Sequence, residues 1–77
     1  MKFKKGDIVY CIDNIVYSIM EEEMVPSREL NFDTPYEVEN PNGGGNDLKL
    51  KAIEYYYRWQ RFISAEEFNI KNSLKIL

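Results

Sequence analysis

The chain has 77 residues, 30% of them charged, and a formal net charge of −3. This length allows one domain with a small core and a modest stability of roughly 3–5 kcal/mol. The negative balance disfavours a general nucleic-acid binder, because neutralising phosphates requires a surplus of cations on at least one face.

Cysteine and histidine usage excludes several kinds of site. Cys11 is the single cysteine, so no disulfide can form within the chain, and a reducing cytoplasm is the expected compartment. There is no histidine, which removes the commonest metal ligand and the usual general base near neutral pH. No apolar run approaches the ~20 residues that cross a membrane, and residues 1–7 lead into no signal-peptide cleavage site. We therefore expect no cofactor, no metal and no membrane association.

The first expected strand follows a turn at Gly6-Asp7 and covers the run IVYCI, residues 8–12. Two faces are possible for it, and the alternation does not decide whether Val9 and Cys11 or their neighbours point inward. Because Cys11 lies in mid-strand and no histidine can activate it, we expect a buried structural thiol rather than a nucleophile.

Residues 15–34 form an irregular stretch, in which the run IVYSIM precedes the acidic residues 21–23. We expect a long, partly hairpinned first loop. The alternative is a single helical turn, since Ile15 and Ile19 fall at helical spacing and Pro26 would end it. Consecutive glutamates do not converge on one point, so they predict a solvated acidic surface rather than a cation site.

Two further strands are expected from alternation of polar and apolar residues. Tyr36 and Val38 in PYEVE face the core. The segment PNGGGND, residues 41–47, is a flexible glycine loop rather than a phosphate-binding P-loop, because it leads into a strand and lacks the GK[ST] ending. In DLKLKAI one face holds Leu48, Leu50 and Ala52, and the other holds Lys49, Lys51 and Ile53.

The segment EYYYRWQRF, residues 54–62, interleaves aromatic residues with two arginines. Such a pattern is typical of nucleic-acid faces, but a small β-protein also needs these rings for its core. After a turn near residues 54–56, strand parity directs Tyr57 and Trp59 inward with Ile63, with Tyr55 at the start of that face, and leaves Tyr56 and Arg58 outside. The patch is therefore interpreted mainly as core, with a protein-binding or a nucleic-acid-binding face as the alternatives.

The C-terminal part predicts a short helical turn. Ser64 and Glu67 form a capping box, which begins a turn with Phe68 pointing inward. Asn72-Ser73 breaks the pattern, and LKIL closes the chain as a last short strand. The total is about five short strands and one short helical turn near the C-terminus, a mainly β chain of the small-barrel type.

Three stretches, GDIVYCIDN (6–14), ELNFDTPYEV (29–38) and WQRFISAEEF (59–68), together resemble a loose class of small phage and prophage proteins with an SH3-like β-barrel. The class opens with a Gly-Asp-x-Val-x-Cys-Ile-Asp strand, continues with Leu-x-x-Gly-x-x-Tyr-x-Val after a long loop, and closes with Arg-Phe before a helical turn. The resemblance implies a single SH3-like barrel domain over residues 1–77. It also implies that Val9, Cys11, Ile63 and Phe68 point inward.

The chain departs from this class at two places. Asp33 replaces the glycine before the second strand, although aspartate tolerates the same turn conformation. The glutamates 21–23 make the first loop long and acidic. Small barrels host unrelated functions, so the resemblance implies a fold more than an activity. The tandem tryptophan and the Pro-Ser-Asn-Tyr ending of peptide-binding SH3 domains are missing, and polyproline ligands are not expected.

The leading functional hypothesis is a non-catalytic protein-interaction module rather than an enzyme. The resemblance implies that it is phage-encoded and that it docks on, or inhibits, a host or defence protein in the host cytoplasm. Tyrosine and arginine are favoured interface anchors, and a run of glutamates suits a basic partner through electrostatic steering. The expected contact residues are Glu21, Glu22, Glu23, Tyr10, Tyr56, Arg58 and Trp59.

The alternative hypothesis is a small nucleic-acid-binding barrel in which Tyr56 or Trp59 stacks on a base. Its affinity would fall steeply with salt. The basic face would consist of Lys2, Lys4, Lys5, Lys49, Lys51, Arg58 and Arg61. A third hypothesis is a virion or assembly component that self-associates through an exposed strand edge.

Overall fold

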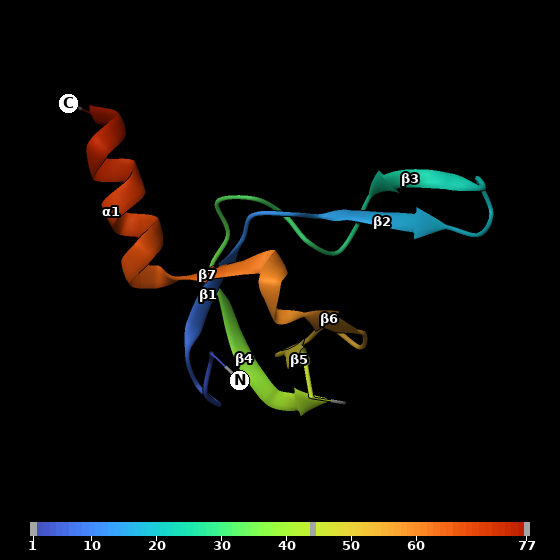
Figure 1. Ribbon diagram of the computed structural model, residues 1–77, viewed down its shortest axis with the longest axis horizontal. Coiled ribbons are helices and arrows are strands. Elements are labelled where there is room, and N and C mark those ends of the chain that lie inside the picture. The colour runs from blue at the N-terminus through green and yellow to red at the C-terminus, as the bar shows by residue number, and fades with distance from the viewer. Residues whose placement is uncertain (1, 44, 77) are drawn as a thin grey trace.

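The computed structural model describes residues 2–43 and 45–76. They form seven strands, one 3₁₀ turn and one α-helix (Figure 1), which confirms the mainly β prediction. In chain order the elements are β1 (Ile8–Cys11), β2 (Ile15–Ser18), β3 (Glu23–Pro26), β4 (Tyr36–Gly43), β5 (Asp47–Leu50), β6 (Tyr56–Arg58), η1 (Trp59–Arg61), β7 (Phe62–Ser64) and α1 (Ala65–Ile76).

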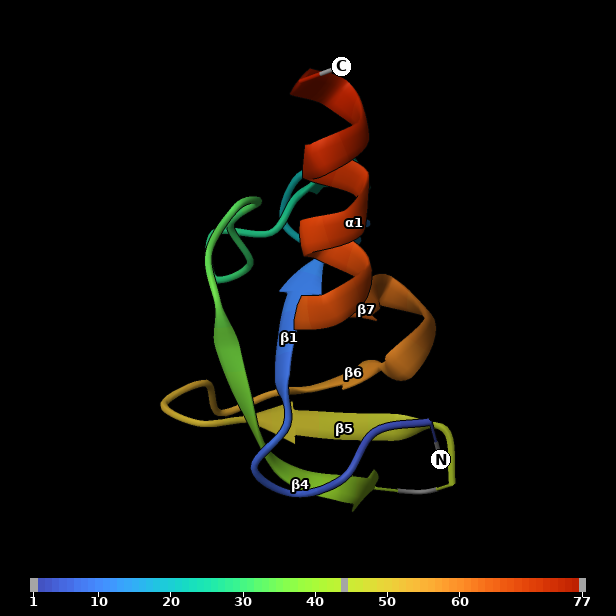
Figure 2. The same cartoon turned by 90° about the vertical axis from the view of Figure 1, so that its left-hand side faces the viewer.

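Five of the strands form the main sheet, in the order β6-β5-β4-β1-β7, and every neighbouring pair is antiparallel. Figure 2 shows a strongly twisted sheet, in which β5 runs across the direction of β1. β2 and β3 form a separate hairpin inside the long first loop. The single strand expected after residues 54–56 is divided by η1 into β6 and β7, so this prediction was wrong. Closure into an SH3-like barrel stays a prediction, since the described strands β6 and β7 are joined by η1 and form no ladder with each other.

Two turns direct the chain into the sheet. Gly6 adopts φ 92°, and the backbone N–H of Lys4 donates to the Asp7 carboxylate at 2.9 Å, so the expected Gly6-Asp7 turn is confirmed. Asp33, which stands where glycine was expected, has φ 59°. Aspartate visits this left-handed region more easily than most residues, so the chain can enter β4 without glycine.

The main core lies on one face of this sheet. Val9, Leu30, Val38, Leu48 and Leu50 are fully buried, with Phe62 beside them. The inward positions predicted for β1, β4 and the start of β5 are therefore confirmed. Leu30 comes from the loop after β3 and has no periodic pattern around it, which is why the sequence did not predict its burial.

The strand expected over residues 47–53 is shorter than predicted. β5 ends at Leu50, and Ala52 follows with φ 71° in a turn. This turn changes which residues face the core. Ile53 is therefore buried rather than outward-facing, and Ala52 is exposed. The expected glycine loop 41–47 is shorter as well, because β4 continues to Gly43 through two register irregularities before Gly43 pairs with Asp47; Gly44 lies outside the described residues.

The predicted helical turn and final strand are replaced by α1, a helix of 12 residues. The Ser64 hydroxyl accepts the backbone N–H of Glu67 at 3.1 Å, as the capping box predicted. Asn72 and Ser73 were interpreted as a break, but the helix continues through them. Each costs a helix no more than about 0.7 kcal/mol relative to alanine, which is too little to end it. Residues 74–76 are therefore helical, and Leu77 lies outside the described residues.

Phe68 is not part of the main core, which corrects the position that the resemblance implied. Its ring stacks on Tyr10 with centroids 3.7 Å apart and an interplanar angle of 3°. Tyr10 pairs with Ile63 in the β1–β7 ladder, so both side chains point to the sheet face opposite Val9 and Cys11. Helix α1 covers this face. Ile63 is buried as expected, but on this face rather than with Val9 and Cys11.

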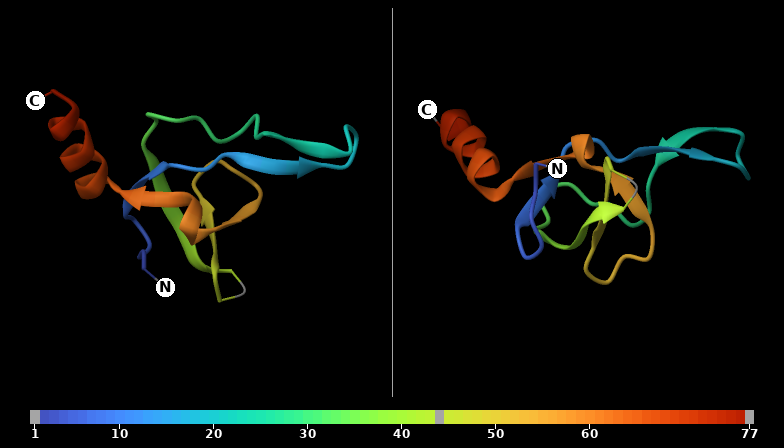
Figure 3. Two further views of the ribbon diagram at one scale, coloured as in Figure 1. Left: turned by 45° about the horizontal axis from the view of Figure 1, so that its top comes forward. Right: turned by 60° about the horizontal axis from the view of Figure 1, so that its bottom comes forward.

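The hairpin and α1 both project from the body, as Figures 1 and 3 show. The chain therefore measures 42 Å along its longest axis and 19 Å along its shortest. No helix within residues 2–43 and 45–76 is long and apolar enough to cross a membrane.

Candidate functional site

The acidic residues 21–23 lie at the tip of the β2–β3 hairpin, and all three are exposed. In the ladder between the two strands, Val16 lies opposite Val25 and Ser18 lies opposite Glu23. The Ser18 hydroxyl accepts the N–H of Glu21 at 3.2 Å, and Glu22 takes φ 54° to complete the turn. The expected hairpin is thus confirmed over the helical alternative, and it holds three carboxylates at one end of the molecule.

Arg61 clamps the base of this hairpin to the body. Its Nη1 donates to the carbonyl oxygens of Ile15 at 2.6 Å and Asp13 at 3.2 Å, and it pairs with the Asp13 carboxylate at 3.5 Å. The Asn14 amide adds a hydrogen bond to the Leu30 carbonyl at 3.2 Å. Arg61 was expected on a nucleic-acid face. Its guanidinium instead binds groups of the chain itself and fixes the orientation of the hairpin.

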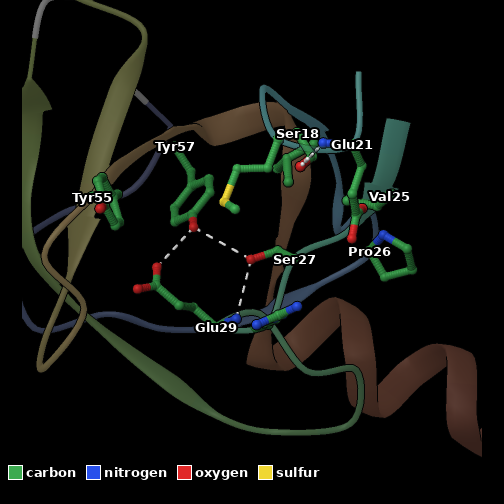
Figure 4. A pocket seen from close by; sticks show the side chains of 11 residues that line it. Ser18, Glu21, Val25, Pro26, Ser27, Glu29, Tyr55 and Tyr57 are labelled. Atoms are coloured by element: carbon green, nitrogen blue, oxygen red, sulfur yellow. Dashed lines mark hydrogen bonds between the residues drawn. The ribbon is translucent and has the colours of Figure 1, made fainter. Parts of the chain in front are cut away.

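A groove of about 600 Å³ runs between the hairpin, the segment that follows it and the chain around β6 (Figure 4). The hairpin side exposes Val16, Val25 and Pro26 to it, and the opposite side exposes Tyr55 and Tyr57. Segments that are far apart in the sequence therefore meet here, because the hairpin folds back beside the β5–β6 connection.

A polar network holds one wall of the groove. The Tyr57 hydroxyl donates to the Glu29 carboxylate at 2.9 Å and lies 3.4 Å from the Ser27 hydroxyl. The Ser27 hydroxyl also accepts the backbone N–H of Glu29 at 3.2 Å. Burial, reinforced by the hydrogen bond to Glu29, raises the pKa of Tyr57, so its hydroxyl stays a donor at neutral pH. Figure 4 shows the Glu29 carboxylate and the Tyr57 hydroxyl directed toward each other.

The rim of the groove is apolar and open to solvent. Met20 is 95% exposed and Tyr55 is 65% exposed, although both line the groove. Glu21, Arg28 and Glu29 supply the charged groups. The groove thus combines exposed apolar contacts with a positioned carboxylate, a combination suited to binding a side chain with an apolar stem and a cationic end.

The expected contact residues are only partly brought together. Tyr56 is 44% exposed, its hydroxyl accepting from the Asn40 amide at 3.1 Å, and Arg58 is exposed beside it. Trp59 packs against the core as expected, although η1 interrupts the strand whose parity predicted it, and Tyr10 lies under α1. The expected set missed Glu29, Met20 and Tyr55 as groove residues. The sequence indicated these groove residues only weakly, through the expected hairpin. The hairpin brings the residues that flank it beside β6 only after it has folded.

The basic face of the nucleic-acid alternative is largely neutralised within the protein. Lys2 pairs with Glu67 at 3.0 Å and Lys51 with Glu37 at 3.3 Å. Lys49 pairs with Glu39, and this hydrogen bond lowers the pKa of Glu39 and raises that of Lys49. Arg61 pairs with the Asp13 carboxylate, so four of the seven expected cations have carboxylate partners. The exposed residues Lys4, Lys5 and Arg58 have none among the described residues.

Cys11 is buried, with only 4% of its surface exposed, and this burial raises the pKa of its thiol. We expect the thiol to react with a soluble disulfide reagent at pH 8 about 100-fold or more slowly in native protein than in denaturant, because a stability of roughly 3–5 kcal/mol keeps the unfolded fraction below ~1%. The rate is followed by absorbance of the released thiolate. Equal rates in the two conditions would contradict the buried position.

Within the described ranges, no three acidic or cysteine side chains gather closely enough to hold a metal ion. No family model matches the chain, no curated protein matches its sequence, and no solved structure matches it. The resemblance to small phage SH3-like proteins therefore stays a prediction, and the functional argument rests on the groove and the hairpin.

Proposed function

We propose that this protein is a non-catalytic interaction module whose groove binds an extended, basic segment of a partner protein. The observation that supports this most is the groove of about 600 Å³, which presents the Glu29 carboxylate between exposed apolar rims. Pockets of this size are large enough to bind a small ligand or the side chains of a peptide.

The chemistry of the groove favours a lysine or arginine side chain. Its cationic end pairs with Glu29, which keeps a second carboxylate oxygen beyond the one that accepts from Tyr57. Its methylene stem packs on the exposed ring of Tyr55, where a cation–π contact adds to the attraction. Arg28, on the same groove, suits a carbonyl or carboxylate of the same segment.

The hairpin tip contributes to the rate of association, and its Glu21 also supplies a carboxylate to the groove. Residues 21–23 are exposed and have no ion-pair partner among the described residues. A negative projection of this kind attracts a basic partner surface over roughly a Debye length, about 8–10 Å at physiological salt. The association rate is therefore expected to fall with ionic strength more than the dissociation rate rises.

A binding role is also supported by what the side chains can do chemically. The chain has no histidine, and Cys11 is buried with a raised pKa. The likeness of three stretches to small phage proteins supports the more specific proposal that the module is phage-encoded and acts on a host or defence protein in the host cytoplasm.

Affinity capture from host lysate, treated with nuclease, tests the proposal through two matched variants. Tyr55→Ala removes a ring from the groove, and Tyr56→Ala removes the neighbouring ring outside it. We expect Tyr55→Ala to lose the captured protein, with an affinity for that purified partner at least ~30-fold weaker, as for an interface hot spot. Tyr56→Ala retains it.

A charge-reversed tip serves as the second arm of the experiment. Replacing Glu21, Glu22 and Glu23 together by lysine is expected to abolish capture while leaving the circular dichroism spectrum unchanged. Equal losses in Tyr55→Ala and Tyr56→Ala would place the contact elsewhere. Capture that disappears with nuclease would mean that nucleic acid is what the protein binds.

A further inference from the structure

β6 is an edge strand of the main sheet, and its outer side is unpaired. The Trp59 N–H donates to the Asn46 carbonyl at 2.9 Å, which makes these two residues a hydrogen-bonded pair that continues the β5–β6 ladder. Hydrogen-bonded and non-hydrogen-bonded pairs alternate in an antiparallel ladder, so Tyr57 also directs its backbone groups toward β5, whereas Tyr56 and Arg58 direct theirs away from it. No described residue bonds to the N–H or carbonyl of Tyr56 or to the N–H of Arg58.

The other edge of the sheet is protected. In β7 the Phe62 N–H already donates to the Trp59 carbonyl, and α1 begins directly after Ser64. Proteins protect sheet edges in such ways because an unpaired edge is a template for another strand. Within the described part of the sheet, β6 is therefore the edge that is open to a further strand.

The groove lies beside this open edge. Figure 1 shows that the β2–β3 hairpin extends on the side of the sheet where β6 lies. In Figure 4, Tyr55 and Tyr57 stand on one side of the groove, and Val25 lies across it. Val16 and Val25 are only half-buried on this inner side of the hairpin. Because a two-stranded hairpin is marginal in water without a further layer, a strand in the groove would stabilise it.

We propose that the partner segment binds as a sixth strand of the main sheet, paired to the outer side of β6. This inference rests on the proposed groove function and specifies how the segment is held. The added strand lies about 4.8 Å from β6, the usual spacing in a sheet, and its backbone bonds to Tyr56 and Arg58. Main-chain hydrogen bonds supply affinity in this mode of binding, and pockets for alternate side chains supply specificity.

The groove determines which side chains the added strand carries. Its residue beside Tyr57 points to the same face as Tyr57, toward the Glu29 carboxylate, so lysine or arginine suits that position. The next side chain on this face comes two residues along and meets Val16, Val25 and Pro26, so an apolar residue suits it. The segment therefore carries a basic and an apolar residue two positions apart.

The chemistry of this edge selects a polypeptide over a nucleic acid. A strand edge pairs with a backbone that offers N–H and C=O groups at the spacing of a strand. Glu21 and Glu29 add two carboxylates to the groove, against the one cation, Arg28, among the residues that line it. This balance attracts a basic peptide and disfavours phosphate.

Arg58→Pro tests the added strand, because proline fits this position of β6. The φ of Arg58 is −63°, which is the angle that proline imposes, and its N–H points away from β5. Arg58→Ala is the matched variant: both variants lose the guanidinium, and only Arg58→Pro loses the N–H. Circular dichroism checks that both are folded.

The probe is a peptide selected on the wild-type protein from a ribosome-displayed library of random peptides. We expect the selected sequences to place a basic and an apolar residue two positions apart. By fluorescence anisotropy, such a peptide should bind Arg58→Pro at least ~10-fold more weakly than Arg58→Ala, because the peptide carbonyl that faces position 58 loses its donor.

Amide exchange of the wild type, followed by NMR, gives a second measurement that needs no variant. Bound peptide should slow exchange of the Tyr56 and Arg58 N–H groups at least ~10-fold, because they gain partners. The Tyr57 N–H, which already faces β5, should change less.

The outcomes separate the added strand from the groove function. A peptide that Tyr55→Ala releases overturns the added strand alone if it binds Arg58→Pro and Arg58→Ala equally and leaves Tyr56 exchange unchanged. A selection that yields no peptide overturns both proposals. Free protein that sediments as a dimer with a protected Tyr56 N–H would make a second copy the occupant of this edge, and it also overturns the added partner strand.

Discussion

Replacing Phe62 by alanine is expected to leave the chain unfolded at room temperature. Phe62 is 2% exposed and packs in the main core with Val9, Leu30 and Leu48. Truncating a buried phenylalanine costs about 3–5 kcal/mol. That cost equals the whole stability of roughly 3–5 kcal/mol that a chain of this length is expected to have. Circular dichroism in a urea titration measures it, and the variant should show no cooperative transition.

Phe32→Ala is the matched control for this experiment. Phe32 is 52% exposed on the turn before β4, so its removal should change the free energy of unfolding by no more than about 0.5 kcal/mol. If Phe62→Ala retained a cooperative transition near the wild-type midpoint, the core would not depend on this ring as the packing indicates.

Arg61→Ala is expected to release the hairpin from the body. The variant loses the donor to the Ile15 and Asp13 carbonyl oxygens and leaves them without this partner. Hydrogen bonds to a charged group are worth about 1.5–3 kcal/mol, so the free energy of unfolding should fall by that amount. Amide exchange at Val16 and Val25, measured by NMR, should accelerate more than exchange at Val9 and Val38, because the hairpin opens locally before the main sheet does.

Arg58→Ala provides the comparison for Arg61→Ala. Arg58 is exposed, lies just before η1 and has no ion pair among the described residues, so its loss should leave hairpin exchange unchanged. Because the groove exists only while the hairpin stays beside β6, Arg61→Ala should also weaken partner binding as Tyr55→Ala does. Unchanged hairpin protection in Arg61→Ala would show that the clamp does not position the hairpin.

The groove shows why the candidate site was only partly predictable from the sequence. Glu21 was expected at an interface because it belongs to a run of three consecutive glutamates, a local pattern that indicates an acidic surface. Glu29 was not, since it belongs to no local pattern. Tyr55 was expected at the start of the inward face, but it is 65% exposed and lines the groove instead. Glu29 and Tyr55 become neighbours only when the hairpin folds back toward β6, a contact between segments more than twenty residues apart that local propensities do not encode.

The sequence by itself determined the features that depend on neighbouring residues. Alternation with a period of two predicted the burial of Val38 and Leu48, the Ser64 cap followed from its distance to Glu67, and Asp33 was expected to replace glycine in its turn. The tertiary structure decided the rest: the burial of Leu30 and Ile53, the stacking of Phe68 on Tyr10, and the engagement of Arg61 with the hairpin. Those contacts depend on which strands pair and in which register. That choice minimises the free energy of the whole chain, and no short segment holds enough information to make it.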